Sequence, residues 1–237
     1  MREAGAATER TARGFDRMAP VYDLLAGLGL GGRIHASQVA LLPRLPGAER
    51  ALVLGDGTGR FLCELLKSGG AAHAVSIDAS PCMTRLTAER LMAHGLAERA
   101  TLRVGGLEQL GDERFDLVVT HYFLDLFDNA ELGGVAARLE TALLPGGHWL
   151  FSDFATPGHG CAGLARRSVV AGLYAFFRAA CGINARQLPN FDRAFDAIGL
   201  ERLADESLGA GLLSAALLRK SVRGERGRPP VGPTPGA

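Results

Sequence analysis

Short apolar runs alternate with longer segments of helical periodicity along most of the chain. The strand-like runs are residues 51–54, 72–78, 100–104, 114–120 and 149–153. Helical spacing of apolar positions is found in residues 33–42, 61–67, 81–93, 130–143 and 191–198. Two further apolar runs, 200–206 and 212–218, follow without a helix between them. Five strand–helix steps and a closing strand pair predict an α/β domain built around one sheet.

A glycine turn separates the first strand from the helix that follows it. Gly55-Asp-Gly-Thr-Gly59 comes directly after the apolar run 51–54. Glycine allows positive φ and brings backbone N–H groups close to a ligand, and the helix start adds partial positive charge. The turn therefore predicts a nucleotide-like ligand. A dinucleotide fold usually has the spacing G-x-G-x-x-G, but here Gly59 comes one residue early and Arg60 takes the expected position.

Asp78 stands at the carboxyl end of the second strand, 23 residues after Gly55. An acidic residue at about this distance from the glycines accepts hydrogen bonds from a ribose diol. Ligand hydroxyls would also compensate a carboxylate at the end of an apolar strand. The alternative is a cap for the helix 81–93, for which Ser80, just before Pro81, is the better candidate.

Val53-Leu-Gly-Asp-Gly-Thr-Gly-Arg60 resembles motif I of the class I S-adenosylmethionine-dependent methyltransferases. Phe115-Asp-Leu-Val-Val119 and the phrase L-x-P-G-G-x-x-x-x-x-D, which ends at Asp153, resemble later motifs of that family. The phrase F-D-x-x-A-x-x-Y-D, from Phe15, is similar to the N-terminal segment of its quinone-biosynthesis C-methyltransferase group. The resemblance covers about residues 15–218. It implies a doubly wound, seven-stranded, mostly parallel sheet with an antiparallel last strand.

The resemblance also implies S-adenosyl-L-methionine as cofactor, with contacts at positions that match the family's. These positions are Gly55, Asp56, Gly57, Thr58, Gly59, Asp78, Ala79, Met83, Gly106, Leu107 and Thr120. Two positions depart from the family, because Val53 and Gly106 stand where acidic residues are usual. Asp56 is a candidate substitute for the first acid. Backbone groups at Gly106 and Leu107 are the first candidates for the second, and the side chain of Glu108 comes after them. The alternative role of Glu108 is a helix cap or a surface charge.

Methyl transfer from a sulfonium is an SN2 displacement, so the protein mainly has to align the nucleophile, the methyl carbon and the sulfur. An alcohol, phenol or acidic carbon as acceptor also needs a base, and His121 at the end of the fourth strand is the candidate; the alternative is a structural hydrogen bond. Candidate acceptor-site residues are Tyr22, Tyr122, Asp125, Asp153 and Tyr174. Asp125 is alternatively a cap for the helix that begins near Asn129.

The chain outside the sheet is expected to form a disordered start (1–13), an N-terminal helical cap (14–46) within a methyltransferase domain (14–219), and a disordered tail (220–237). The helical insertion 157–190 contains an apolar run, 168–177, flanked by arginines. This run predicts a wall or lid of an apolar acceptor pocket that also contacts a membrane surface. The alternative is a helix packed on the sheet or in a dimer interface.

Composition narrows the class of protein. A net charge of +1 over 237 residues gives no nucleic-acid footprint. The four cysteines are scattered without a C-x-x-C, which indicates neither a disulfide framework nor a metal site. With no signal-like segment and no apolar stretch of membrane-spanning length, we expect a cytoplasmic enzyme, monomeric or homodimeric. It would methylate a small apolar or aromatic molecule. The alternatives are a non-catalytic binding or regulatory protein and a nicotinamide-dependent oxidoreductase.

Overall fold

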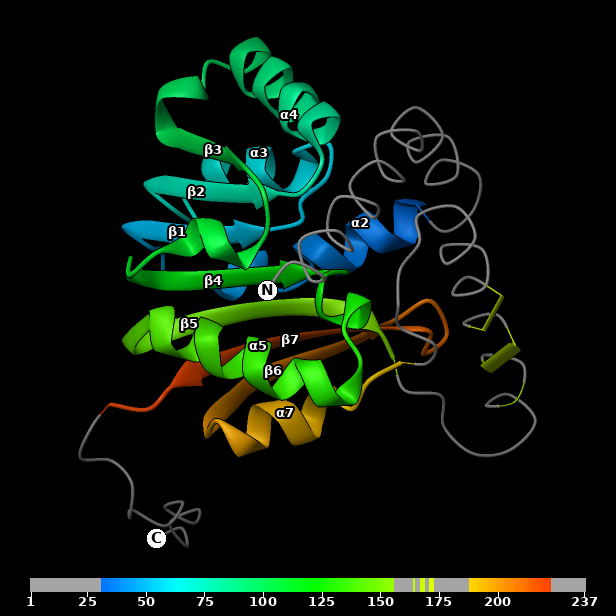
Figure 1. Ribbon diagram of the computed structural model, residues 1–237. Helices are drawn as coiled ribbons and strands as arrows, with labels where there is room; N and C mark the ends of the chain where they lie inside the picture. The colour runs from blue at the N-terminus through cyan, green and yellow to red at the C-terminus, as the bar shows by residue number, and fades with distance from the viewer. Residues whose placement is uncertain (1–30, 156–163, 165–166, 169–170, 173–187, 223–237) are drawn as a thin grey trace, which may run out of the picture.

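The computed structural model describes residues 31–155, 164, 167–168, 171–172 and 188–222 (Figure 1). Several sequence-based expectations therefore lie outside the described residues. They concern Tyr22, Tyr174, the start 1–13 and the tail beyond residue 222. Of the segment 14–46 only residues 31–46 are described, and of the segment 157–190 only residues 164, 167–168, 171–172 and 188–190.

Within the described residues, seven strands form one sheet in the order β3-β2-β1-β4-β5-β7-β6 (Figure 1). The strands are β1 Arg50–Leu54, β2 His73–Asp78, β3 Ala100–Val104, β4 Phe115–His121, β5 Leu143–Phe154, β6 Leu200–Leu208 and β7 Leu213–Lys220. β1 to β5 pair in parallel, and β7 runs antiparallel to both β5 and β6. The predicted seven-stranded, doubly wound sheet with an antiparallel last strand is confirmed.

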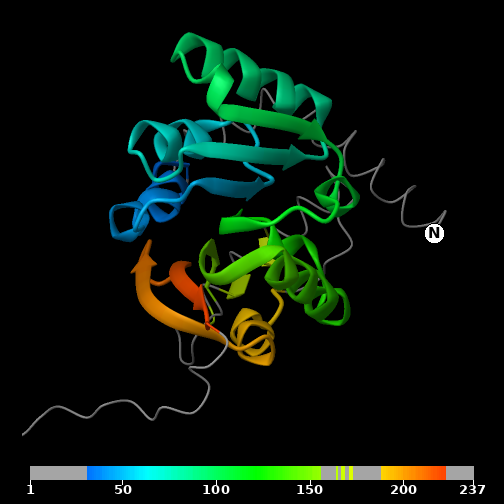
Figure 2. The same ribbon diagram turned by 90° about the vertical axis from the view of Figure 1, so that its left-hand side faces the viewer.

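Helices cover both faces of the sheet (Figures 1 and 2). They are α2 Gly31–Val39, α3 Arg60–Lys67, α4 Pro81–Ala93, α5 Asn129–Ala142 and α7 Phe191–Ala197, with short 3-10 turns η2 Leu42–Arg44, η3 Ala97–Arg99, η4 Leu107–Leu110 and η5 Leu124–Leu126. One core lies under α5 and α7 and another under α3 and α4. β1 has alternate residues in both cores, which explains its uninterrupted apolar sequence.

The predicted ends of several elements were wrong. The first described helix spans Gly31–Val39 rather than 33–42, so it begins and ends earlier than its apolar spacing predicted. β5 begins at Leu143, directly after α5, and not at Trp149. A Cβ on Gly147 would lie 3.0 Å from the Asp116 backbone oxygen, so this glycine lets β5 continue close beside β4.

Lys220, the first residue of the expected tail, lies in a strand. Lys220 belongs to β7, and its ammonium group donates to the backbone oxygens of Glu140 and Leu143 at 2.6 and 2.7 Å. It also lies 3.1 Å from the Glu140 carboxylate. The last strand is therefore anchored to the end of α5. Across the described parts of the chain, no helix is long and apolar enough to cross a membrane.

Candidate active site

The carboxyl ends of β1, β2, β4 and β5 meet at one edge of the sheet, and the glycine turn lies there. Gly55, Gly57 and Gly59 have φ angles of +66°, +64° and +76°, a region that side-chain-bearing residues avoid. The Gly55 N–H still donates to the Ile77 oxygen at 3.0 Å, so the turn begins in register with β2. The three glycines are thus required by the backbone that β1 and α3 impose.

One side of α4 holds the outer part of this turn. The Thr87 hydroxyl donates to the Gly57 oxygen at 2.9 Å, and the Arg90 guanidinium donates to both the backbone oxygen and the hydroxyl of Thr58. A Cβ on Gly59 would lie 2.8 Å from a Thr87 methyl carbon. Met83, one turn earlier on α4, is buried beside Gly57. The turn is therefore fixed from outside by side chains.

Asp78 lies beside the glycine turn, where the sequence placed it. Its two carboxylate oxygens accept from the backbone N–H groups of Gly57, at 3.1 Å, and Ser80, at 2.9 Å. Ser80 caps α4 by accepting from the Met83 N–H at 3.1 Å, so the alternative role of Asp78 as cap is wrong. Each oxygen of a carboxylate can accept from more than one donor, so these two hydrogen bonds are compatible with further donors from a ligand.

Asp56 faces α3 rather than the open side of the turn. It accepts from the Leu62 backbone N–H at 3.1 Å, and a further hydrogen bond comes from the Phe61 backbone. Burial raises its pKa to about 7, against the lowering effect of these N–H donors. Val53, at the position of the family's usual acid, is 1% exposed in the core beneath α3. Asp56 thus supplies a carboxyl group near this position, directed at a helix start.

The turn after β3 has no acidic side chain at Gly106, but a neighbour folds over it. The Glu108 carboxylate accepts from the Gly106 N–H at 2.7 Å, and a Cβ on Gly106 would lie 2.8 Å from the other carboxylate oxygen. Leu107 packs partly buried against the core under α5, and Ala79 is partly exposed between Asp78 and Ser80. Glu108 is therefore exposed at the place where an acid was expected.

The end of β4 combines a buried side chain and an aromatic cover. Thr120 is fully buried, and its hydroxyl accepts from the Trp149 indole N–H at 2.8 Å. Its hydroxyl is therefore engaged inside the protein. Phe123 lies over the glycine turn, since a Cβ on Gly55 would be 3.1 Å from its ring. Its ring packs edge-on against Phe127 with centroids 5.4 Å apart.

His121 is enclosed in the protein. It is 3% exposed and its ring packs edge-on against Phe61, with centroids 4.3 Å apart. Neither ring nitrogen has a hydrogen-bond partner among the described residues. Burial first, and then the charge of His35, lower its pKa to about 3. So weak a base argues against the general-base role suggested by the sequence, and the alternative of a structural hydrogen bond finds no partner in the described residues either.

Tyr122 has a backbone conformation that is unusual for its type. Its φ is +51°, a strain that proteins retain mostly where the surroundings enforce it. The Tyr122 N–H donates to the Ser152 oxygen at 2.8 Å, and its hydroxyl lies 2.7 Å from the Ser37 hydroxyl on α2. Its ring meets Phe154 edge-on at 5.3 Å. These contacts hold the phenol at the carboxyl edge between β4, β5 and α2.

Asp125 and Asp153 form a buried acidic pair beside Tyr122. The Asp125 N–H donates to one Asp153 carboxylate oxygen at 3.3 Å, and the Phe154 N–H donates to the other at 2.8 Å. Burial raises the pKa of Asp125 to about 7; burial and then the neighbouring carboxyl raise that of Asp153 well above its usual range. Asp125 does not cap α5, because Asp128 forms the capping box there.

Sequence reasoning brought the glycine turn, Asp78, Met83 and the two acids to the same edge, but it missed three residues. Phe123 covers the turn, and Thr87 and Arg90 fix it from α4. The last two carried a detectable signal. Met83, Thr87 and Arg90 follow each other at spacings of four and three, which puts them on one side of the helix.

The comparisons with known proteins agree with this arrangement. Residues 51–147 match the family model of the methyltransferase domain. Demethylmenaquinone methyltransferase of Roseiflexus sp. (strain RS-1) is 32% identical over 170 residues, which cover 63% of this chain and 69% of that protein.

Among solved structures, a Burkholderia thailandensis 1,6-didemethyltoxoflavin-N1-methyltransferase with bound 1,6-didemethyltoxoflavin and S-adenosylhomocysteine matches with a TM-score of 0.64 at 18% identity, over 93% of this chain and 90% of that one. An O-methyltransferase family protein from the same organism matches with a TM-score of 0.62 at 16% identity. That match covers 88% of this chain but only 59% of the other. These two likenesses concern the fold. With its domain match, its relative and its sheet, the chain belongs to the class I S-adenosylmethionine-dependent methyltransferases, near the quinone C-methyltransferase group.

Proposed function

We propose that this enzyme binds S-adenosylmethionine at the glycine turn and transfers its methyl group to a small apolar or aromatic acceptor by SN2 displacement. The observation that carries the proposal is the hydrogen bond between the Gly57 N–H and the Asp78 carboxylate. The hydrogen bond from the Gly57 N–H holds the carboxylate at the mouth of a turn with three positive-φ glycines. A ribose diol and an amino-acid chain would be recognised there together.

The remaining cofactor contacts are proposed for the residues around this hydrogen bond. Met83, on the helix that follows β2, and Leu107, in the turn that follows β3, are apolar groups suited to an adenine ring. Glu108, which is held by the Gly106 N–H, would accept from the adenine amino group in place of the missing acid. Asp56 keeps the start of α3 in place, and the backbone of Thr120 borders the site.

The acceptor would lie beyond the turn, beside the aromatic rings that follow β4 and β5. Tyr122, Phe123 and Phe154 supply an apolar surface with one phenol hydroxyl. The relative that is named a demethylmenaquinone methyltransferase makes a quinol ring the first acceptor to test. The segments 14–46, with Tyr22, and 157–190, with Tyr174, are proposed to enclose this acceptor.

A phenol or an acidic carbon must also lose a proton, and we assign its acceptance to the Asp125–Asp153 pair rather than to His121. A base works best when its pKa is near the working pH. Asp125, with a pKa of about 7, meets this condition, whereas His121, with a pKa of about 3, does not. Only one proton need move, from the acceptor to the pair, as the carbon–sulfur bond breaks.

The test is calorimetric titration of S-adenosylmethionine and S-adenosylhomocysteine into the wild type and Asp78→Ala. Loss of a charge-assisted hydrogen bond to the ribose should weaken binding by about tenfold or more. Asp112→Ala is the matched control, because Asp112 is an exposed carboxylate on the turn before β4. Saturable binding would then be followed by turnover with a reduced naphthoquinone and with simple phenols. A folded wild type that binds neither cofactor would refute the proposal and favour a regulatory protein.

A further inference from the structure

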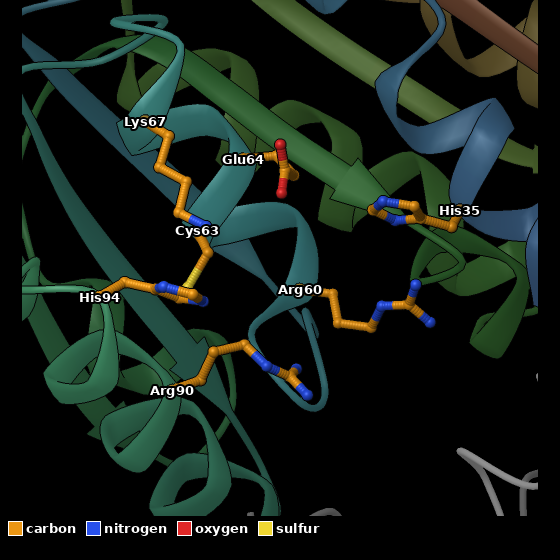
Figure 3. Close-up of a pocket in the computed structure, with 7 residues that line it drawn as sticks. All are labelled: His35, Arg60, Cys63, Glu64, Lys67, Arg90 and His94. Carbon is orange, nitrogen blue, oxygen red and sulfur yellow. The ribbon is translucent and has the colours of Figure 1, made fainter.

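A basic groove lies next to the glycine turn, and its lining includes none of the residues assigned above to cofactor and acceptor. It has a volume of about 200 Å³ and is lined by His35, Arg60, Cys63, Glu64, Lys67, Arg90 and His94. Arg60, Glu64 and Lys67 lie one turn apart on α3, Arg90 lies on α4, His94 directly follows α4, and His35 lies on α2 (Figure 3). Three helices thus meet around one hollow.

The groove carries an excess of positive charge. Arg60, Lys67 and Arg90 are opposed by the single carboxylate of Glu64, which leaves a net charge of +2 with both histidines counted as neutral. Within the described part of the chain, none of the three cations has a carboxylate within 4.0 Å. Like charges around one hollow repel one another, and an anion between them would relieve that repulsion.

The donors of this groove approach from different sides. Arg90 uses one guanidinium nitrogen for Thr58, and its other three N–H groups have no partner among the described residues. Figure 3 shows Arg60 and Lys67 at opposite ends of α3 and Arg90 across from them. The floor is the Cys63 thiol, which is 2% exposed and whose pKa is raised by burial, so it adds no negative charge.

We infer that this groove binds a phosphate group. Guanidinium forks match the oxygens of a phosphate in pairs, and an ammonium adds a point charge. A dianion would neutralise the net charge of the lining. The volume is below the range of sites for drug-sized ligands, which suits one phosphate and not a whole nucleotide. The phosphate comes either from a small phosphorylated molecule or from the headgroup of an anionic lipid.

The groove is joined to the glycine turn through Arg90, whose guanidinium holds the Thr58 backbone oxygen. A phosphate in the groove would compete for, or orient, the same side chain. Phosphate binding in the groove would therefore act, through Arg90, on the turn at which the cofactor is proposed to bind. The inference about phosphate itself does not depend on that cofactor, and it is tested without it.

The first experiment titrates the nitrogen-15-labelled full chain with inorganic phosphate at constant ionic strength. We expect saturable shifts of the side-chain Nε–H resonances of Arg60 and Arg90, with no saturation when chloride replaces phosphate. Arg60→Gln/Lys67→Gln should weaken phosphate binding by about tenfold or more. Arg85→Gln is the matched control, since Arg85 is an exposed cation on α4 that pairs with Glu89 outside the groove. If the double variant is less stable than the wild type, Lys67→Gln alone replaces it in the phosphate titration.

The second experiment separates the two sources of phosphate. Sedimentation with vesicles of phosphatidylcholine plus phosphatidic acid should carry down the wild type and not Arg60→Gln/Lys67→Gln if a lipid headgroup occupies the groove. Saturable binding of free phosphate without such sedimentation identifies a soluble ligand instead. Linear shifts without saturation, together with vesicle binding that is absent or unchanged in the groove variant, would overturn the inference.

Discussion

Asp125→Asn should make the stability of this protein less dependent on pH. Burial raises the pKa of Asp125 from 3.8 to about 7, so the folded chain holds this proton more tightly than the unfolded chain does. Stability from this group is then fully present below about pH 4 and is lost as the pH rises from there to about 7. Above about pH 7 the free-energy cost of burying the ionised Asp125 carboxylate no longer changes with pH.

The size of the effect follows from the shift. At 1.36 kcal/mol for each pH unit, a buried carboxyl with these two pKa values costs about 2 kcal/mol at pH 5 and about 4 kcal/mol at pH 8. The difference is about 2 kcal/mol, and removing Asp125 also removes the neighbouring carboxyl that raises the pKa of Asp153. Replacing Asp125 by asparagine removes the ionisation but keeps the shape of the side chain.

The assay is urea unfolding of the wild type and the variant at both pH values. The difference between the two measurements cancels any pH-independent cost of the amide. We expect the variant to gain about 2 kcal/mol relative to the wild type between pH 5 and pH 8. The matched control is Asp112→Asn, which removes an exposed carboxylate. A variant whose stability relative to the wild type is the same at both pH values would refute the buried, protonated state of Asp125.

Three further substitutions test the turn and the strand end. Gly59→Ala should destabilise the fold by about 2–3 kcal/mol in urea unfolding, because φ is +76° and the new Cβ meets Thr87, whereas Gly133→Ala on α5 meets nothing within 4 Å and should be neutral or stabilising. Arg90→Met should weaken S-adenosylmethionine binding about tenfold by calorimetry, because the Thr58 oxygen loses its donor, while the control Arg85→Met leaves the affinity unchanged. Equal affinities of Arg90→Met and the wild type would show that this contact from α4 does not support cofactor binding. His121→Phe keeps an aromatic ring beside Phe61 and should retain turnover within about threefold, whereas a loss of a hundredfold or more at every pH would restore the imidazole to catalysis.

The sheet could be predicted from the sequence because its signals are local. Apolar runs bounded by glycine and proline marked each strand, and the spacing of Gly55 and Asp78 placed both at one edge. The errors occurred where a tertiary contact overrides a local signal. Gly147 lay outside the predicted strand 149–153, but it lets β5 pass close to the Asp116 backbone, which nothing near residue 147 in the sequence could show.

Roles at the site were harder to predict than positions, because burial decides them. His121 has the residue type and strand-end position of a base, yet its pKa of about 3 comes from being enclosed beside Phe61 and His35. Thr120 was a candidate contact for the cofactor, but its hydroxyl accepts a hydrogen bond from the indole N–H of Trp149, which lies 29 residues later in the sequence. Neither partner can be identified before the chain is folded.

Burial moves four titratable groups near the ends of β1, β4 and β5 towards their neutral forms, which connects the fold to its chemistry. The pKa values of Asp56, Asp125 and Asp153 rise and that of His121 falls, so each group is moved towards its neutral form. Such shifts require that water be kept from the carboxyl edge of β4 and β5. A dry edge with little fixed charge suits an apolar acceptor and increases the attraction between a sulfonium and any carboxylate that does ionise. A cation bound beside the Asp125–Asp153 pair, as proposed for the sulfonium of the cofactor, would lower both pKa values and release a proton.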